Sequence, residues 1–137
     1  MSTNRSPEEF LAEANVAVLA TVDRRGRPHA APVWYLYQGG QFLISTDRGS
    51  QKHRNIEANP EITLVIDRRT LPYYAVIARG KAEIGPRFTG EERLRLAVRY
   101  LGEEMGRAFV ASVSGEETVS VRLSPRKLIE FDGRAGR

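Results

Sequence analysis

The chain has 137 residues, of which 41% are hydrophobic and 28% charged, and this is the size and composition of one globular domain. It contains no cysteine, so disulfide bridges, thiolate nucleophiles and cysteine-ligated metal centres are excluded. The net charge is +4, which favours an anionic partner unless the arginine excess is only compositional. No apolar run is long enough to span a membrane and the first residues lack the apolar core of a signal peptide, so we expect a cytoplasmic protein.

The first third of the chain predicts one short helix followed by strands. Ser6-Pro7-Glu8-Glu9 combines a capping serine, an early proline and a glutamate, which predicts a helix ending near Asn15. The β-branched run 16–22 predicts a strand buried on both faces. A second strand is expected over 28–37, and a two-glycine turn joins it to a third strand over 41–45 in a hairpin.

The rest of the chain continues with strands and a few helices. The expected elements are a helix over 50–58 that follows cap chemistry ending at Ser50, strands over 62–67 and 73–84, the second with a bend at Gly80, and a helix that begins with a capping box at Thr89 and ends at Gly102. A helix around 105–111 and strands over 118–123 and 127–131 follow. In the helix from Thr89 to Gly102, the helical spacing of Leu94, Ala97, Val98 and Leu101 predicts that this stripe faces a core. About five to seven strands in hairpin order favour a small antiparallel barrel over a doubly wound parallel sheet. We therefore expect a single, mainly β domain over 1–137 with frayed ends at 1–6 and 133–137.

The residue inventory excludes several kinds of site. The two histidines, His29 and His53, are not in a metal-ligand spacing, so no metal site is expected. A serine nucleophile elbow, a phosphate-binding glycine loop and a dinucleotide-binding glycine turn are also missing from the sequence. A bound nucleotide would therefore need another geometry.

Hydroxyl, amide and basic side chains gather around the start of the expected helix over 50–58. They are Ser45, Thr46, Arg48, Ser50, Gln51, Lys52 and Arg54. Hydroxyls, cations and the unpaired N–H groups of a helix start are the components of a phosphate pocket. A solvated cationic helix face is the alternative interpretation of the same residues.

The segment from Gly49 to Pro60 resembles the helix of the pyridoxamine 5′-phosphate oxidase-like family, the flavin-binding split β-barrels. In that helix a basic pair precedes an ending of the form Ile56-Glu57-Ala58-Asn59-Pro60. Residues 26–34, 42–46 and 78–83 resemble strands of the family in the same order. The resemblance extends over about residues 8–131 and implies a split antiparallel β-barrel with a few short helices that binds FMN.

The resemblance also implies a homodimer with a cofactor held at the subunit interface by both chains. Lys52 is then expected to pair with the cofactor phosphate, and Gln51 occupies a position that is usually arginine in the oxidases. Arg54 or Arg48 is expected to compensate for the missing charge. The other expected contacts are phosphate or ribityl donors Ser45 and Thr46, ring-lining Pro32, Val33 and Trp34, and Tyr73, Tyr74 and Arg79 from the partner chain. Ordinary barrel packing is the alternative role for Trp34 and both tyrosines.

The resemblance implies flavin or deazaflavin chemistry in general, but not the specific reaction of the pyridoxamine phosphate oxidases. Pyridoxamine phosphate oxidases carry an Arg-x-His type of motif near their C-terminus, whereas this sequence has no histidine after His53. We therefore do not expect pyridoxamine phosphate oxidation. The segment 99–102 is similar to the branch of reductases that use FMN or the deazaflavin coenzyme F-420. The cofactor carries the hydride chemistry in such enzymes, so we assign no catalytic side chain.

Three functional hypotheses follow from the sequence. The first is an oxidoreductase that uses FMN or coenzyme F-420 to reduce a small conjugated substrate. The second is a flavin-binding carrier or sensor without turnover. The third and weakest is a nucleic-acid-binding barrel, suggested by the arginine excess and by Trp34, Tyr35 and Tyr37 on one strand. Strand alternation leaves at most two of these rings on one face, so we do not expect a nucleic-acid partner. We do not expect a membrane partner either, because no apolar run is long enough to span a bilayer.

Overall fold

The computed structural model describes residues 6–133, which form a single antiparallel sheet of eight strands with helices packed around it. The strands follow the order β2-β1-β5-β6-β7-β4-β3, and β8 pairs with β6. The strands are β1 (Ala17–Val22), β2 (Pro28–Val33), β3 (Leu36–Gln38), β4 (Gln41–Asp47), β5 (Glu61–Arg68), β6 (Tyr74–Gly85), β7 (Thr118–Leu123) and β8 (Lys127–Asp132). The helices of this part of the chain are α1 (Pro7–Leu11), α2 (Gln51–Ala58), α3 (Gly90–Leu101) and α4 (Glu103–Ser112).

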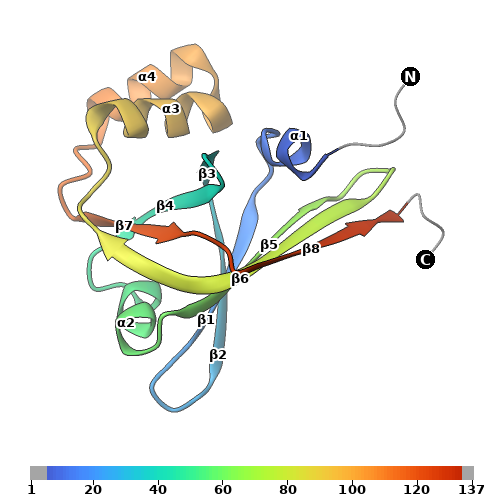
Figure 1. Ribbon diagram of the computed structural model, residues 1–137. Helices are drawn as coiled ribbons and strands as arrows, with labels where there is room; N and C mark the ends of the chain where they lie inside the picture. The colour runs from blue at the N-terminus through green and yellow to red at the C-terminus, as the bar shows by residue number, and fades with distance from the viewer. Residues whose placement is uncertain (1–5, 134–137) are drawn as a thin grey trace.

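The arrangement confirms the expected split antiparallel β-barrel. Figure 1 shows the strongly curved β6 joining two groups of strands, with α3 and α4 side by side above the group that contains β3, β4 and β7. Helix α2 contacts β1, β4 and β6. The chain therefore forms one sheet curled around a core, with a helical hairpin at one end.

A glycine lets β6 pass from one group of strands to the other. The first half of β6 pairs with β5 and β8, whereas Ala82–Gly85 pairs with β7. A Cβ at Gly80 would lie 3.1 Å from the backbone nitrogen of Arg126 and 3.3 Å from the carbonyl oxygen of Ser124. A side chain at position 80 would force the β7–β8 turn to shift by a few tenths of an ångström, so glycine suits this close crossing in the curved β6, where the glycine bend was predicted.

Two helix-capping predictions are confirmed, but α1 is shorter than predicted. The capping boxes that begin at Ser6 and at Thr89 are both present. Helix α1 ends at Leu11 instead of near Asn15. The reason is tertiary, because the guanidinium of Arg99 donates to the carbonyl oxygens of Leu11, Ala12 and Glu13 at 3.0, 3.1 and 2.7 Å. These bonds satisfy the end of the helix without further helical turns.

The predicted single strand over 28–37 is wrong, because the chain breaks at Trp34 and Tyr35. The first part, β2, pairs with β1, and the second part, β3, pairs with β4 on the other side of the barrel. At the break the amide of Tyr35 donates to the hydroxyl oxygen of Tyr100 at 3.2 Å. Apolar and aromatic residues continue without interruption from Val33 to Tyr37, so the sequence pattern does not reveal the break.

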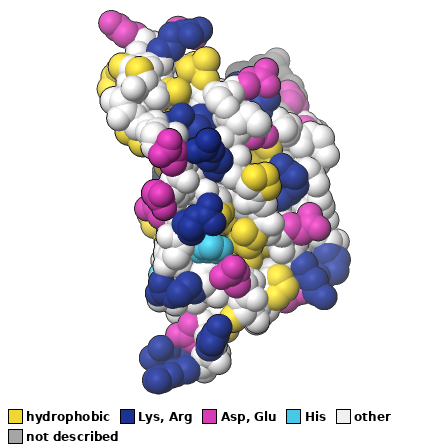
Figure 2. Space-filling view, turned by 90° about the vertical axis from the view of Figure 1, so that its left-hand side faces the viewer, with side chains coloured by type: hydrophobic (Ala, Val, Ile, Leu, Met, Phe, Trp, Pro, Cys, Tyr) yellow, Lys and Arg dark blue, Asp and Glu magenta, His cyan; other side chains and the backbone are white. Residues whose placement is uncertain are grey.

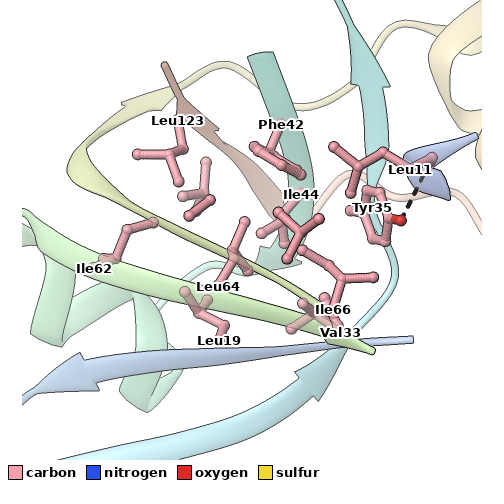
Figure 3. Packing of buried hydrophobic residues seen from close by; sticks show 14 of the residues in the cluster. Leu11, Leu19, Val33, Tyr35, Phe42, Ile44, Ile62, Leu64, Ile66 and Leu123 are labelled. Carbon is pink, nitrogen blue, oxygen red and sulfur yellow. Dashed lines mark hydrogen bonds between the residues drawn. The ribbon is translucent and has the colours of Figure 1, made fainter. Parts of the chain in front are cut away.

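The main core lies inside the curled sheet. Figure 3 shows Leu19, Leu64 and Ile66 from β1 and β5 pointing toward Phe42 and Ile44 from β4. Tyr35 is buried at the α1 side of this core, and its hydroxyl donates to the carbonyl oxygen of Leu11 in α1 at 3.2 Å. A smaller cluster, formed by Leu36, Leu43 and Phe88 with Leu96 packed against it, joins α3 to the barrel.

The two chain ends were predicted to fray, and the described part of each is held by hydrogen bonds. Ser6 caps α1, and its amide donates to the Glu9 carboxylate at 3.2 Å. At the other end Asp132 pairs with Tyr74, and the amide of Gly133 donates to the carbonyl oxygen of Tyr73 at 2.9 Å. The remaining residues of these predictions, 1–5 and 134–137, lie outside the described part of the chain.

Candidate functional site

A cavity of about 610 Å³ lies between the end of β4, the start of α2 and the α3–α4 hairpin. Its polar lining residues are Ser45, Thr46, Asp47, Lys52, Arg93 and Thr118. Its other lining residues are Val16, Pro32, Val33, Trp34, Phe88, Leu96, Ala97, Phe109, Val113 and Gly115. The volume lies within the range of about 300–1,000 Å³ that is typical of small-molecule and cofactor sites.

The polar end of the cavity is built by the turn from β4 into α2. Ser50 caps α2, because its hydroxyl accepts a hydrogen bond from the amide of His53 at 3.3 Å. The same hydroxyl lies 3.3 Å from the hydroxyl of Thr46, at the end of β4. The amide of Gly49, a residue with φ of +79°, donates to Nδ1 of His53 at 2.9 Å. These bonds fix the turn so that the Thr46 and Lys52 side chains line one cavity.

The Lys52 ammonium has no ion-pair partner within residues 6–133. By contrast, the guanidinium groups of Arg27, Arg68 and Arg126 each pair with a carboxylate, at 2.7, 2.7 and 3.1 Å. An unpaired cation that borders a largely apolar cavity binds an anion more strongly than the same charge on an open surface, since screening is weaker there.

The opposite wall of the cavity is aromatic and aliphatic. Trp34 lies in the break between β2 and β3, and its indole stacks on the Tyr100 ring with centroids 4.7 Å apart and planes at 5°. The ring of Phe109 from α4 lies 6.5 Å from the same indole. Helices α3 and α4 pack so closely that a Cβ at Gly106 would lie only 2.8 Å from the backbone of Val98. The wall is therefore a tightly packed unit.

Six of the residues predicted from the sequence line this cavity. They are Pro32, Val33, Trp34, Ser45, Thr46 and Lys52. The structure thus brings two segments of the predicted site together, the end of β2 and the turn from β4 into α2.

Three other predicted residues of α2 and its cap do not line the cavity. Ser50 caps the helix, whereas Gln51 and Arg54 border a separate hollow beside the β1–β2 turn. The amide nitrogen of Gln51 donates to Asn55 at 2.6 Å, and Arg54 donates to the amide oxygen of Gln51 at 2.8 Å. These side chains therefore bond to α2 itself, and their predicted contacts with a cofactor stay predictions.

The residues predicted to act from a partner chain lie away from the cavity of their own copy. Tyr74 is buried, its ring centroid lies 4.7 Å from that of Phe10, and its hydroxyl bonds to the Glu130 carboxylate. Tyr73 is half-exposed beside it, and Arg79 lies on the exposed face of β6. Tyr74 thus has the packing role that was its alternative, while a role toward a second copy stays a prediction for all three.

Sequence reasoning missed the part of the site that α3 and α4 supply. The predicted core stripe of α3 contained Leu94, Ala97, Val98 and Leu101, and only Ala97 of these is fully buried. The residues of α3 that line the site are instead Arg93, Leu96 and Ala97, and Tyr100 on the same stripe stacks on Trp34. This stripe has the same helical spacing, so a search for a second amphipathic stripe with one cation and one aromatic ring would have found it.

Basic side chains on the surface do not form a continuous patch on the face that Figure 2 shows. There, Lys and Arg side chains alternate with Asp and Glu side chains over the whole height of the molecule. The rings that suggested nucleic-acid stacking are also engaged inside the protein. Tyr35 is fully buried, Tyr37 packs on Phe42 with centroids 4.8 Å apart, and Trp34 stacks on Tyr100.

Within the described range 6–133, no group of three or more His, Asp or Glu residues is placed to hold a metal ion. No helix in that range is long and apolar enough to cross a membrane.

Comparison with known proteins identifies the family. A sequence model described as pyridoxamine 5′-phosphate oxidase matches residues 6–137 of the chain. The chain belongs to the pyridoxamine 5′-phosphate oxidase family. Similar proteins include the pyridoxine/pyridoxamine 5′-phosphate oxidases of Escherichia fergusonii, which is 35% identical over 77 residues, and of Klebsiella pneumoniae, which is 35% identical over 74 residues. These matches cover 56% and 53% of this chain but only 35% and 34% of the two enzymes.

Solved structures match over nearly the whole chain. An F-420 reductase has a TM-score of 0.76 and 27% identity, with 93% of this chain and 98% of that chain covered. A conserved hypothetical protein of Mycobacterium tuberculosis also has a TM-score of 0.76, with 25% identity and coverage of 96% and 87%. The heme storage protein HutZ of Vibrio cholerae has a TM-score of 0.68 at 19% identity, covers 91% and 90%, and shares the fold.

Proposed function

We propose that this member of the pyridoxamine 5′-phosphate oxidase family is an oxidoreductase that binds FMN or coenzyme F-420 in the cavity described above. The observation that carries the proposal is the division of one cavity into two ends. Unpaired Lys52 and the hydroxyls of Ser45 and Thr46 lie at one end, and Trp34 and aliphatic side chains line the other. The 27% identity with an F-420 reductase over 93% of this chain supports it.

The residues present fit a phosphorylated tricyclic cofactor. Lys52 and the two hydroxyls would hold its phosphate, since cations and hydroxyl donors together satisfy phosphate oxygens. Pro32 and Trp34 would pack against its ring system, because aromatic and aliphatic walls gain free energy when they cover a flat apolar ring.

A second copy of the chain would complete this site. Val16, Phe109 and Val113 line the cavity, yet they are 47%, 41% and 43% exposed in the single chain. Apolar residues that border a binding cavity and still face solvent favour a homodimer in which the partner covers them. We propose this homodimer together with the cofactor site, and the experiment below tests both.

The bound cofactor would supply hydride transfer, and the chain would supply position and exclusion of water. Lys52 holds the anionic end, and the packed wall formed by α3 and α4 fixes the place of the ring. A small conjugated molecule is the proposed substrate, because it can stack on the ring from which a hydride leaves. We do not propose pyridoxamine phosphate oxidation, for which the sequence lacks a histidine after His53.

The experiment that tests the proposal is titration of the purified protein with FMN, coenzyme F-420 and haem, followed by absorption and by gel filtration with light scattering. Reduction of a quinone is then measured with whichever compound binds, supplied in its two-electron reduced form as the hydride donor. We expect a dimer that binds FMN or F-420 saturably and reduces the quinone catalytically. Binding without turnover would indicate the carrier or sensor hypothesis, and uptake of haem alone would overturn both. Haem is not favoured by the cavity, whose described lining residues contain no His, Cys, Met or Tyr to ligate iron.

A further inference from the structure

The indole of Trp34 occupies a position that its own strand does not fix. Trp34 is the only tryptophan in the sequence, and it lies between β2, which ends at Val33, and β3, which begins at Leu36. The chain has left the ladder with β1 and has not yet joined the ladder with β4. Contacts from elsewhere must therefore hold this side chain at the cavity.

Tyr100 of α3 supplies these contacts through both its ring and its hydroxyl. The ring stacks on the indole at 4.7 Å and 5°. The hydroxyl oxygen accepts from the amide of Tyr35 at 3.2 Å, and the hydroxyl donates to the carbonyl oxygen of Asn15 at 2.9 Å. One side chain therefore joins α3, the break before β3 and the segment before β1.

Arg99 fixes Tyr100 in turn. Its guanidinium carbon lies 5.3 Å from the centre of the Tyr100 ring and 4.7 Å from that of Tyr35. The same guanidinium donates to three carbonyl oxygens at the end of α1. Since rotation of the Tyr100 side chain would break the hydrogen bonds of its hydroxyl and its stack on Trp34 together, the ring has one well-defined position.

We propose that Tyr100 is a positioning residue that holds Trp34 as a rigid aromatic wall for a flat conjugated ring in the cavity. This inference rests on the proposed function and adds the residue that sets the ring end of the site. A wall that is ordered before binding loses less conformational freedom when the ligand arrives, so affinity rises without any contact between Tyr100 and the ligand.

The test uses the single tryptophan as its own reporter. In the ligand-free protein, acrylamide quenching of Trp34 fluorescence measures how accessible and mobile the indole is. Tyr100→Leu removes the stack and the hydroxyl, whereas Tyr100→Phe keeps the ring and removes only the hydroxyl bonds. Arg95→Ala is the matched control, because Arg95 is on the same helix, is exposed and bonds to Gln38 at the surface.

We expect quenching to increase in the order wild type, Tyr100→Phe, Tyr100→Leu, with Arg95→Ala equal to wild type. Affinity for the bound cofactor should fall by about threefold to tenfold in Tyr100→Leu, as expected for loss of an aromatic pair. If Tyr100→Leu does not fold, Tyr100→Phe decides, with more quenching than wild type and about twofold weaker binding.

The outcomes separate this inference from the proposed function. Folded Tyr100 variants with a lower melting temperature but unchanged quenching and affinity would show a merely structural tyrosine and overturn the inference, while the function stands. A wild-type protein that takes up neither FMN nor coenzyme F-420 would overturn the proposed function and the ligand part of the inference. In that case quenching alone decides whether Tyr100 holds Trp34.

Discussion

The two ends of the cavity are built in different ways. Four of the six polar lining residues come from one continuous segment, from Ser45 to Lys52, in which a strand, a tight turn and a helix start follow each other directly. The apolar end is assembled from segments far apart in the sequence, which include Trp34, Leu96 and Phe109. The proposed anion-binding end is therefore built mainly from neighbouring residues of the chain, whereas the apolar wall forms only after the helical hairpin has packed on the barrel.

This difference predicts different responses to substitution. Loss of the Lys52 ammonium at the polar end should weaken ligand binding with little change in the stability of the fold, because this group has no ion-pair partner within residues 6–133. A change in the packing of the apolar wall should alter both stability and binding, since the same contacts hold the helices and shape the cavity.

Lys52→Ala should have the largest effect and leave stability nearly unchanged. Loss of one charge-assisted hydrogen bond of about 1.5–3 kcal/mol corresponds to cofactor binding weaker by roughly tenfold to a hundredfold. The measurement is a fluorescence or absorption titration together with thermal unfolding. Lys127→Ala on exposed β8 is the matched control for one lost charge. Equal affinity in both variants would contradict the placement of the phosphate at Lys52.

Gly106→Ala should disturb the apolar end most. Its new Cβ would lie 2.8 Å from the Val98 backbone, so α3 and α4 must separate at a cost of about 1–3 kcal/mol. Thermal unfolding should show this loss, and the titration should show weaker cofactor binding. Gly90→Ala at the start of α3 is the control, because a Cβ there meets no atom within 4 Å. A Gly106→Ala protein with weaker binding and full stability would contradict the expected link between the packing of the apolar wall and the stability of the fold.

Tyr35→Phe tests the support beneath the apolar end. Loss of the bond to the Leu11 carbonyl should cost about 0.5–1.5 kcal/mol at neutral pH. Burial raises the pKa of Tyr35 above its ordinary value of 10.0, partly opposed by the charge of Arg99. The unfolded chain therefore ionises first, so the contribution of this tyrosine to stability is complete below pH 10.0 and falls as the pH rises above it.

The measurement is the free energy of unfolding of wild type and Tyr35→Phe across this pH range. The difference between them should shrink above pH 10.0, because only the wild type has the buried hydroxyl. A constant difference would show that Tyr35 titrates alike in both states.

Asp23→Asn should have the smallest effect and leave cofactor binding unchanged. Asp23 lies in the β1–β2 turn, where its carboxylate accepts from the amides of Arg25 and Arg27 at 2.8 and 2.9 Å and from Nε of Arg27 at 2.7 Å. The hydrogen bonds from Arg27 lower the pKa of Asp23 below its ordinary 3.8. Its contribution is thus present above pH 3.8 and is lost as the pH falls through the lowered value.

The check is a slightly lower melting temperature for Asp23→Asn at neutral pH that merges with wild type in acid. A loss of cofactor affinity in this variant would extend the site to the β1–β2 turn, which also borders the hollow beside Gln51 and Arg54.

Local signals in the sequence were sufficient for most elements and for half of the site. Ser6, Ser50 and Thr89 cap helices as predicted, and the Gly39-Gly40 hairpin and the Gly80 bend are present. In the site, the residues around Lys52 were found because cap, hydroxyl and cation are neighbours in the sequence. The break at Trp34 and the early end of α1 were missed, because each depends on one bond network from α3.

The sequence by itself determined the class of the fold, the family and the position of the polar turn from β4 into α2, because these depend on side-chain periodicity, capping and short motifs within a few residues of each other. Only the tertiary structure decided which stripe of α3 faces the cavity, where Arg99 ends α1 and how Tyr100 stacks on Trp34. These features are contacts between segments separated by many residues, and a contact of that kind leaves no periodic trace in either segment alone.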